Sequence, residues 1–463
     1  MKLFSGIISD IRGRLPHYKD DWTAGFRDRK VLSSTIYMYF ISILPAITFG
    51  AFINNRTDGQ MGVVEVLLAD AVCGVIAAIF FGQPLVLVGV TGPVTIFCDT
   101  LYQISVMFEL AFLPWLFWVS MWAALMHIAL AVVNASSIVR FVTRFSEEVF
   151  GVLIAVIFVV SAITEFSVIF VHADLDAALL SLLLGIGVFL TSMALFSARS
   201  WTLFNPLTRG LIADYGTVAT IVVYTACQFL PRLSSAVIPR LAVPLTFEPT
   251  ADRAWFVNAM ETPTWGVFAA IIPAFVLTIL FFFDHNISAL LTQKPEFNLR
   301  KPPSFNWDIL VLGLGVFVSG LLGLPPTNGL IPHAPMHVRS LAKIEETTEG
   351  AAKKETWISV CENRVSALGQ SALIGITLAP PFLYVLSWVP LGVLAGIFLY
   401  MGFTSFYGNQ LIERSVRFFT QSDLVNNAMP HLSAPSKPSL GFTLIQWLMV
   451  GIIFGITYTP AGI

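Results

Sequence analysis

Two apolar stretches of the chain are interrupted near their middles by glycine and proline. The first break is Gly-Val-Thr-Gly-Pro at residues 89–93, and the second is Pro-Pro-Thr-Asn-Gly-Leu-Ile-Pro at residues 325–332. A helix broken inside a bilayer exposes N–H and C=O groups that lipid cannot satisfy, so such breaks survive only where protein buries them or where they line a cavity. Two breaks in the two halves of one chain are typical of the binding site of a transporter. The chain is therefore expected to carry a solute.

Each break is followed by a segment that can restart as a helix, with Pro93 near the first turn of one of them. A helix N-terminus presents unpaired N–H groups and the positive end of a dipole. Two such ends facing one cavity form an anion site that needs no arginine. The expected substrate-binding residues are Thr91, Gly92, Pro93, Val94, Thr95, Asn328, Gly329, Leu330, Ile331 and His333, with Gln83 as a secondary candidate. Proline kinks without a ligand are the alternative.

Asp284 lies deep in a third apolar stretch, after Leu-Phe-Phe-Phe and about three helical turns before Lys294. A carboxylate at this depth costs about 3 kcal/mol or more unless it is protonated, solvated or paired. We expect it to face a cavity and to couple transport to protons. A cytoplasmic-end residue that reaches the interface is the alternative. His285 and Asn286 are weaker candidates, because three consecutive residues cannot all share one helix face.

Two other acidic residues are lesser candidates. Asp99 follows Pro93 by six residues, and Asp70 lies within the second predicted span. Either residue can equally be a packing contact to a neighbouring helix. His127 is better explained as a hydrogen bond between helices than as a ligand.

The composition is that of a membrane protein. Of the 463 residues, 56% are hydrophobic and 12% are charged, whereas soluble domains contain about 25% charged residues. The net charge of −2 gives no sign of nucleic-acid binding. The polar first 30 residues lack the apolar core of a signal peptide. The four cysteines stand singly, without metal or disulfide spacing, so no metal and no cofactor is expected.

Stretches of about 20 mostly apolar residues predict an all-α polytopic fold embedded in membrane lipid. The expected helices are 31–53, 63–81, 83–105 (broken), 112–133, 149–170, 177–196, 211–230, 266–291, 309–323, 328–340 (a half-helix), 365–387, 388–403 and 441–460.

Lysine and arginine gather at the N-terminus and in alternate loops, which predicts a cytoplasmic N-terminus. The basic loops are 134–148, 197–210, 292–308, 341–364 and 404–440. Loop 231–265 carries three arginines on the opposite side, but the rule weakens for longer loops. Residues 138–145 and 406–419 place aromatic and charged groups on different faces, so they are expected to lie along the membrane surface, with ordinary linkers as the alternative.

Several strings resemble one family. Gly-Gln-Pro-Leu-Val-Leu-Val-Gly-Val-Thr-Gly-Pro at residues 82–93 is similar to the third-helix signature of the bicarbonate/anion-exchanger superfamily. Strings at residues 12–15, 18–19, 21–23, 211–216, 283–288, 297–304 and 321–332 resemble its borate-transporter branch in fungi and plants. The resemblance spans nearly the whole chain.

The resemblance implies an inverted repeat of seven plus seven helices, with an elevator-like motion of a core domain against a gate domain. The implied limits are a cytoplasmic segment 1–30, core 31–133, an amphipathic linker 134–148, gate 149–265, core 266–387 and gate 388–463. Substrate would bind between the two half-helices, and the gate would form a homodimer. Asp284 matches a family acid implicated in proton coupling or substrate binding. The implied activity is proton-coupled export of borate or boric acid at the plasma membrane, with the vacuole as the alternative.

Three features depart from the family pattern. His333 or a neighbour stands where chloride/bicarbonate exchangers have an arginine, there is no large soluble N-terminal domain, and residue 463 precedes the expected last helix, so the chain looks truncated. A bicarbonate or other inorganic-anion exchanger remains the main alternative, ahead of a nucleobase or sulfate carrier. A membrane enzyme would need a reactive cluster, and the nearest one, His172 with Asp174 and Asp176, is better explained as a solvated turn. A receptor would not explain two broken helices.

Overall fold

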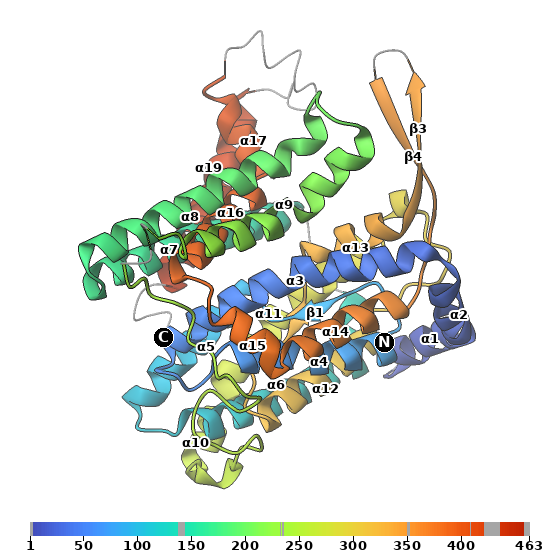
Figure 1. Ribbon diagram of the computed structural model, residues 1–463. Coiled ribbons are helices and arrows are strands. Elements are labelled where there is room, and N and C mark those ends of the chain that lie inside the picture. Colours follow the sequence, from blue (N-terminus) through green and yellow to red (C-terminus); the bar gives the residue numbers. More distant parts are fainter. Residues whose placement is uncertain are drawn as a thin grey trace. The chain divides into compact units, whose positions relative to one another are not determined.

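The computed structural model describes residues 3–137, 144–231, 233, 236–349, 352–407, 409–420 and 436–457, most of them in α-helices (Figure 1). Contacts divide the chain into two units, each assembled from two separate stretches of sequence. Unit 1 comprises residues 1–139 and 242–387, and unit 2 comprises residues 140–241 and 388–463. Residues 242–265, which the sequence assigns to the gate domain, belong to unit 1 in this division.

The first stretch of unit 1 is helical apart from a short strand at the first break. Its elements are α1 (Ser5–Arg14), η1 (Leu15–His17), α2 (Tyr18–Arg27), α3 (Arg29–Arg56), α4 (Val63–Phe80), β1 (Val88–Gly89), α5 (Gly92–Met107) and α6 (Phe112–Val132). Acidic side chains mark two helix starts. The Asp28 carboxylate accepts the Lys30 N–H at 3.0 Å before α3, and Glu65 accepts the Gly62 N–H at 2.8 Å at the start of α4.

The second stretch of unit 1 repeats the order of helix, short strand and helix. Its elements are η4 (Ala259–Glu261), α10 (Thr264–Ala269), α11 (Ile271–Thr292), η5 (Pro295–Phe297), α12 (Asn306–Leu321), β2 (Asn328–Gly329), α13 (His333–Leu341), β3 (Ala342–Glu349), β4 (Ala352–Val360), α14 (Val365–Thr377) and α15 (Pro380–Leu386). Thus α4–β1–α5 in the first stretch has a counterpart, α12–β2–α13, in the second.

Two segments of this stretch differ from the sequence-based expectation. Within the predicted loop 341–364, residues 342–349 and 352–360 form the paired antiparallel strands β3 and β4, which follow α13 in Figure 1. The predicted single helix 365–387 is wrong, because α14 and α15 meet at a bend of 78°. Pro380 and Pro381 explain the bend, since proline cannot continue a helix but is well suited to start one.

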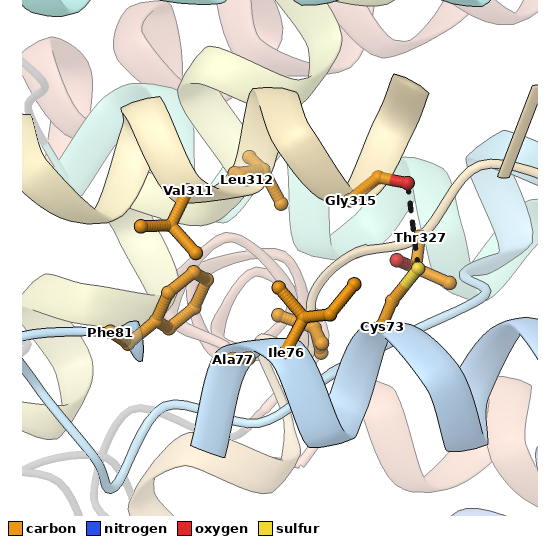
Figure 2. Close-up of a pocket in the computed structure, with 9 residues that line it drawn as sticks. Cys73, Ile76, Ala77, Phe81, Val311, Leu312, Gly315 and Thr327 are labelled. Atoms are coloured by element: carbon orange, nitrogen blue, oxygen red, sulfur yellow. Dashed lines mark hydrogen bonds between the residues drawn. The ribbon is translucent and has the colours of Figure 1, made fainter. Parts of the chain in front are cut away.

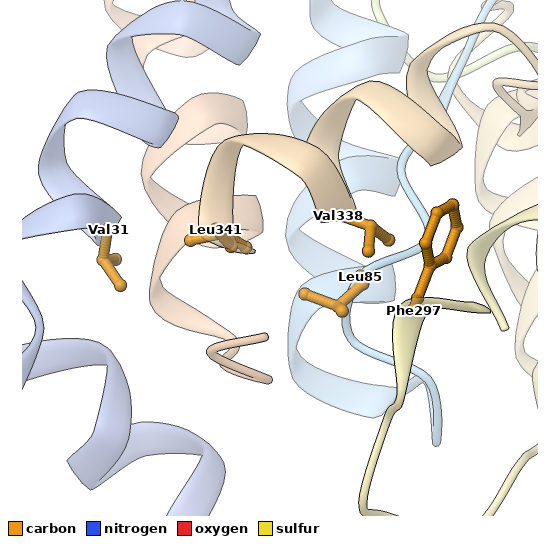
Figure 3. Packing of buried hydrophobic residues seen from close by; sticks show 5 residues of the cluster. All are labelled: Val31, Leu85, Phe297, Val338 and Leu341. Atoms are coloured by element: carbon orange, nitrogen blue, oxygen red, sulfur yellow. The ribbon is translucent and has the colours of Figure 1, made fainter. Parts of the chain in front are cut away.

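The helices of unit 1 pack around the two breaks. α12 packs against α6 and α4, and α14 packs against α4 and α3. One buried apolar cluster consists of Val31, Leu85, Phe297, Val338 and Leu341 (Figure 3). A second cluster includes Leu87 and Leu330, each of which adjoins a strand of the breaks. These clusters hold the non-helical segments within a packed interior.

Unit 2 is a separate group of helices. Its elements are α7 (Arg144–His172), α8 (Leu175–Phe196), η3 (Ser197–Ser200), α9 (Pro206–Cys227), α16 (Leu391–Ser405), α17 (Gln410–Arg417) and α19 (Ser436–Thr457). α16 packs against α7 and α8, and it approaches α8 so closely that a Cβ at Gly396 would lie 2.2 Å from the Gly185 carbonyl oxygen. The predicted connector 406–419 contains α17. Residues 138–143 of the other connector lie outside the described residues.

Six helices among the described residues are long and apolar enough to cross a membrane: α3, α4, α6, residues 148–172 of α7, α8, and residues 264–292 of α10 and α11. The bent pairs α14–α15 and α16–α17 raise this number to at most eight. Fewer helices pass this test than the thirteen expected segments, partly because the breaks divide apolar stretches into the shorter helices α5 and α13.

Candidate functional site

The two breaks meet in unit 1. β1 and β2 pair in antiparallel register, with Val88 opposite Gly329 and Gly89 opposite Asn328. The pairing is extended by the Leu330 N–H, which donates to the Leu87 carbonyl oxygen at 2.9 Å. Each break therefore satisfies backbone groups of the other, as buried non-helical chain inside a membrane protein requires. We call the pairing of β1 with β2 the crossing of the two breaks. Since α5 and α13 begin a few residues after β1 and β2, their N-termini lie close to this crossing.

Two buried carboxylates hold the first break in place. Asp308, the third residue of α12, accepts the Gly82 N–H at 2.6 Å and the Gln83 N–H at 3.1 Å. Asp70 in α4 accepts the Val90 N–H at 2.7 Å. A Cβ at Gly89 would lie 3.2 Å from both Asp70 carboxylate oxygens, so glycine permits this close approach. Asp70 thus contacts the break itself, whereas the sequence suggested a packing contact to a neighbouring helix as the alternative to a role in the site.

The residues predicted at the start of α5 lie where the sequence places them. Thr91 precedes the helix, and Gly92 and Pro93 form its first turn. The Thr91 hydroxyl oxygen is buried and has no hydrogen-bond partner among the described residues. The Thr95 hydroxyl instead donates to the Gly92 carbonyl oxygen at 2.6 Å, within its own helix. Val94 is completely buried.

The second break places its polar side chains differently. Asn328 is completely buried, and its Oδ1 accepts the Gly329 N–H at 2.7 Å. The Leu330 side chain belongs to an apolar cluster with Leu87, and its backbone carbonyl oxygen accepts the Ser288 hydroxyl at 3.4 Å. Ile331 is partly exposed. His333 starts α13 and lies beside the Ile41 backbone of α3.

α11 brings Asp284 to the second break. Asp284 is 2% exposed, and its carboxyl group lies against the Asn328 side chain. Neither Asp284 Oδ1 nor Asn328 Nδ2 completes a hydrogen bond within the described part of the chain. Asn286 turns away and donates to the Phe282 carbonyl oxygen at 2.6 Å, within α11. The structure therefore places Asp284 beside Asn328, and the sequence did not predict this pairing.

His285 lies closer to the break than its sequence position suggested. It is completely buried, and its Cα would lie 3.1 Å from a Cβ built at Gly329. Its ring makes an edge contact with Phe81 at a centroid distance of 5.2 Å. Neither ring nitrogen is hydrogen-bonded to any residue that the structure describes. A histidine that follows a buried carboxylate was the available signal, but helical spacing alone could not show which neighbour faces the break.

The structure gives the remaining candidates other hydrogen bonds or ion pairs. Gln83 is buried in the segment between α4 and the first break, where its Oε1 accepts the Leu85 N–H at 3.3 Å. Asp99 pairs with Arg56 at 3.8 Å in a partly exposed position. The predicted helix–helix hydrogen bond of His127 is wrong, because its Nδ1 bonds to the Ala123 carbonyl oxygen of the same helix at 2.7 Å. His172 likewise bonds within α7, in an exposed position.

A small cavity lies between α4 and α12 beside the breaks (Figure 2). Its volume is about 10 Å³, room for at most one water molecule. Val88 and Thr327 contribute to its lining, and the Cys73 thiol donates to the Gly315 carbonyl oxygen at 3.5 Å. The lining is mostly apolar, so we do not identify it with the polar site.

The chemistry of the site follows from its unpaired groups. Most buried polar atoms in proteins are hydrogen-bonded, and each one left unsatisfied costs about 1–3 kcal/mol. Thr91, Asp284, His285 and Asn328 supply both donors and acceptors without partners among the described residues. Residues 82–107, 271–292 and 325–338 contain neither lysine nor arginine. The arrangement is suited to a small hydroxylated solute, with helix N-termini as the source of positive potential.

Comparisons with known proteins cover the whole chain. A model of the HCO3- transporter integral membrane domain matches residues 2–175 and 167–463. Boron transporter 4 of Arabidopsis thaliana is 32% identical, over 100% of this chain and 83% of that protein. Boron transporter 1 of Saccharomyces cerevisiae is 33% identical, over 99% and 80%. The transmembrane domain of the cyanobacterium bicarbonate transporter BicA has a TM-score of 0.61 at 16% identity, covering 92% of this chain and 97% of that one. This similarity confirms the predicted helical membrane fold, and the inverted repeat of seven plus seven helices stays a prediction.

Proposed function

This chain belongs to the HCO3- transporter integral membrane domain family, and within that family of membrane transporters, not enzymes, we propose that it exports borate or boric acid. The observation that carries this choice is the similarity to plant and yeast boron transporters over essentially all of the chain. The strings that resemble the borate-transporter branch include the second break and Asp284, and the first break resembles the signature of the wider superfamily, so the resemblance extends to the site.

The chemistry of boric acid suits the site. Boric acid is a neutral trihydroxy acid that adds hydroxide to become a tetrahedral anion. Its hydroxyl groups both donate and accept, and they match the unpaired groups of Thr91, Asp284 and Asn328. The N-termini of α5 and α13 would stabilise the anionic form without a fixed cation. Substrate would therefore bind beside the crossing of β1 and β2.

Proton coupling is assigned to Asp284. A carboxyl group that is 2% exposed and lies against an amide can hold a proton in one state and release it in another. In the proposed cycle, unit 1 acts as the core that carries the site, and unit 2 acts as the gate and forms a homodimer in the plasma membrane. The motion is elevator-like, and the N-terminus lies on the cytoplasmic side. The vacuolar membrane is the alternative location.

The test is cellular boron in yeast cells that lack their own boron exporter. Cells expressing this protein, its Asp284→Ala variant, its Asp176→Ala variant or an empty vector would be exposed to boric acid. Asp176 is an exposed residue in the first turn of α8 and serves as the matched acidic control. We expect lower boron with the intact protein and with Asp176→Ala, and no reduction with Asp284→Ala at equal surface expression.

Two results would contradict the proposal. Unchanged boron with the intact protein at the cell surface would reject borate export and favour the alternative, a bicarbonate or other inorganic-anion exchanger. Chloride/bicarbonate exchange in proteoliposomes would then test that alternative. Export by Asp284→Ala at the rate of the intact protein would reject the role given to this carboxyl group.

A further inference from the structure

The helix that precedes each break ends in an arginine cap. At the end of α4, Arg364 Nη1 donates to the Ala78 and Ile79 carbonyl oxygens at 3.0 and 3.1 Å. The last carbonyls of a helix have no partner in the helix itself, and a cation there also opposes the negative end of the dipole. Arg364 is 2% exposed, so the cap is an interior structure. The non-helical segment that leads to the first break begins just beyond this cap, at residues 81 and 82.

α12 ends in the same way. Arg253 Nη1 donates to the Leu322 carbonyl oxygen at 3.2 Å, and Nη2 donates to the Gly323 carbonyl oxygen at 3.0 Å. Gly323 has a φ of +62°, a conformation that side chains disfavour. The second break begins at Pro325, two residues later. Arg253 lies in the segment before α10, and Arg364 lies at the start of α14. The two caps therefore come from different parts of the sequence.

Each cap is paired with a completely buried acid on a third element. Arg364 Nε lies 3.2 Å from Asp21 Oδ2 of α2, and Arg253 Nη2 lies 3.7 Å from Glu65 Oε1 of α4. These acids are anchored in turn. Asp21 Oδ1 lies 2.6 Å from the Lys301 ammonium group, and Glu65 Oε1 accepts the Thr250 N–H at 2.7 Å.

The contacts between α4 and α12 are also reciprocal. Glu65 is the third residue of α4, and through Arg253 it holds the end of α12. Asp308 is the third residue of α12, and it accepts the N–H groups of Gly82 and Gln83 just beyond the end of α4. The acid at the start of each helix thus helps to position the break that follows the other helix.

We propose that Arg253 and Arg364 are positioning residues for the substrate site, each fixing one of the two breaks. This inference rests on the proposed function only in treating the breaks as the binding site. A planar guanidinium can hold two adjacent carbonyl groups at once, whereas the lysine ammonium is a point donor. Displacements of about 1 Å in a supporting shell weaken a site substantially.

The test compares Arg253→Lys and Arg364→Lys with wild type, and with Arg240→Lys as a control at an exposed position in unit 2. Amide hydrogen exchange of the purified full chain would be measured by mass spectrometry, together with the KM and maximal rate of boric acid transport. We expect faster exchange at residues 78–93 in Arg364→Lys and at residues 319–333 in Arg253→Lys. KM should rise about tenfold in both, with a maximal rate within about twofold of wild type.

The alternative outcomes separate the hypotheses. Local changes in exchange with an unchanged KM would overturn the positioning role, since the caps would then be structural only. Faster exchange throughout unit 1 in either variant would overturn it as well, because it would indicate general destabilisation. A wild-type protein that moves no boron would reject the proposed function. In that case, faster amide hydrogen exchange confined to the expected break would still support the assignment of each cap to its break.

Discussion

Substitution of Gly329 by alanine tests the geometry of the site most directly. Gly329 lies in β2 opposite Val88, and α11 packs against it. A Cβ at this position would lie 3.1 Å from His285 Cα and 3.1 Å from Ser288 Cβ. Both distances are shorter than ordinary carbon contacts, so either α11 or the strand pair must move by a few tenths of an ångström.

The cost follows from the packing. Overfilling a packed interior by one methyl group costs about 1–3 kcal/mol, which corresponds to roughly 5- to 150-fold in an equilibrium constant. Because the methyl group separates α11 from β2, the separation of Asp284 from Asn328 should change as well. We therefore expect Gly329→Ala to lower the apparent affinity for boric acid within this range while the protein still reaches the cell surface.

Gly315→Ala is the matched control. Its Cβ would lie 3.7 Å from the Cys73 sulfur, an ordinary contact, beside the small cavity of Figure 2. Alanine is also favoured over glycine in a helix by about 1 kcal/mol. We expect this variant to transport like wild type and to unfold at an equal or higher temperature.

The assay is the concentration dependence of boron export in cells, combined with thermal unfolding of the purified protein. Wild-type affinity in Gly329→Ala would refute the reasoning, since it would mean that the contact between α11 and β2 does not determine the site. Equal loss in both glycine variants would refute it too, because the effect would then not depend on the local space.

Two further predictions concern the buried charges. Asp308→Asn keeps one acceptor oxygen for two backbone N–H groups, so it should lower the free energy of unfolding by about 1–3 kcal/mol, whereas Asp99→Asn, which breaks a partly exposed pair with Arg56, should cost at most about 1 kcal/mol. Asp21→Asn leaves the Arg364 charge buried without its partner and should cost about 3–5 kcal/mol. Unfolding temperatures of the three purified variants measure both effects, and equal temperatures for Asp308→Asn and Asp99→Asn would contradict the bracing role of Asp308.

The sequence by itself determined the class of protein and the location of the breaks. Long apolar stretches require helices in lipid, and clustered glycine and proline at residues 89–93 and 325–332 stop those helices wherever the chain folds. The depth of Asp284 within an apolar stretch was equally visible. The motif-based family assignment was confirmed by the family match and by full-length relatives. Roles of individual residues in binding and proton coupling stay predictions.

Only the tertiary structure decided which groups meet at the breaks. Asp308 reaches Gly82 across 226 positions of sequence, and Gly89 pairs with Asn328. Local patterns cannot encode such partners, because hydrophobic periodicity fixes the face of a helix but not its neighbour. For the same reason the sequence could not show that the Thr95 hydroxyl donates to the Gly92 carbonyl oxygen of its own helix. His285 appeared secondary and instead packs against Gly329, since the direction in which α11 faces is set by its packing on α6 and β2.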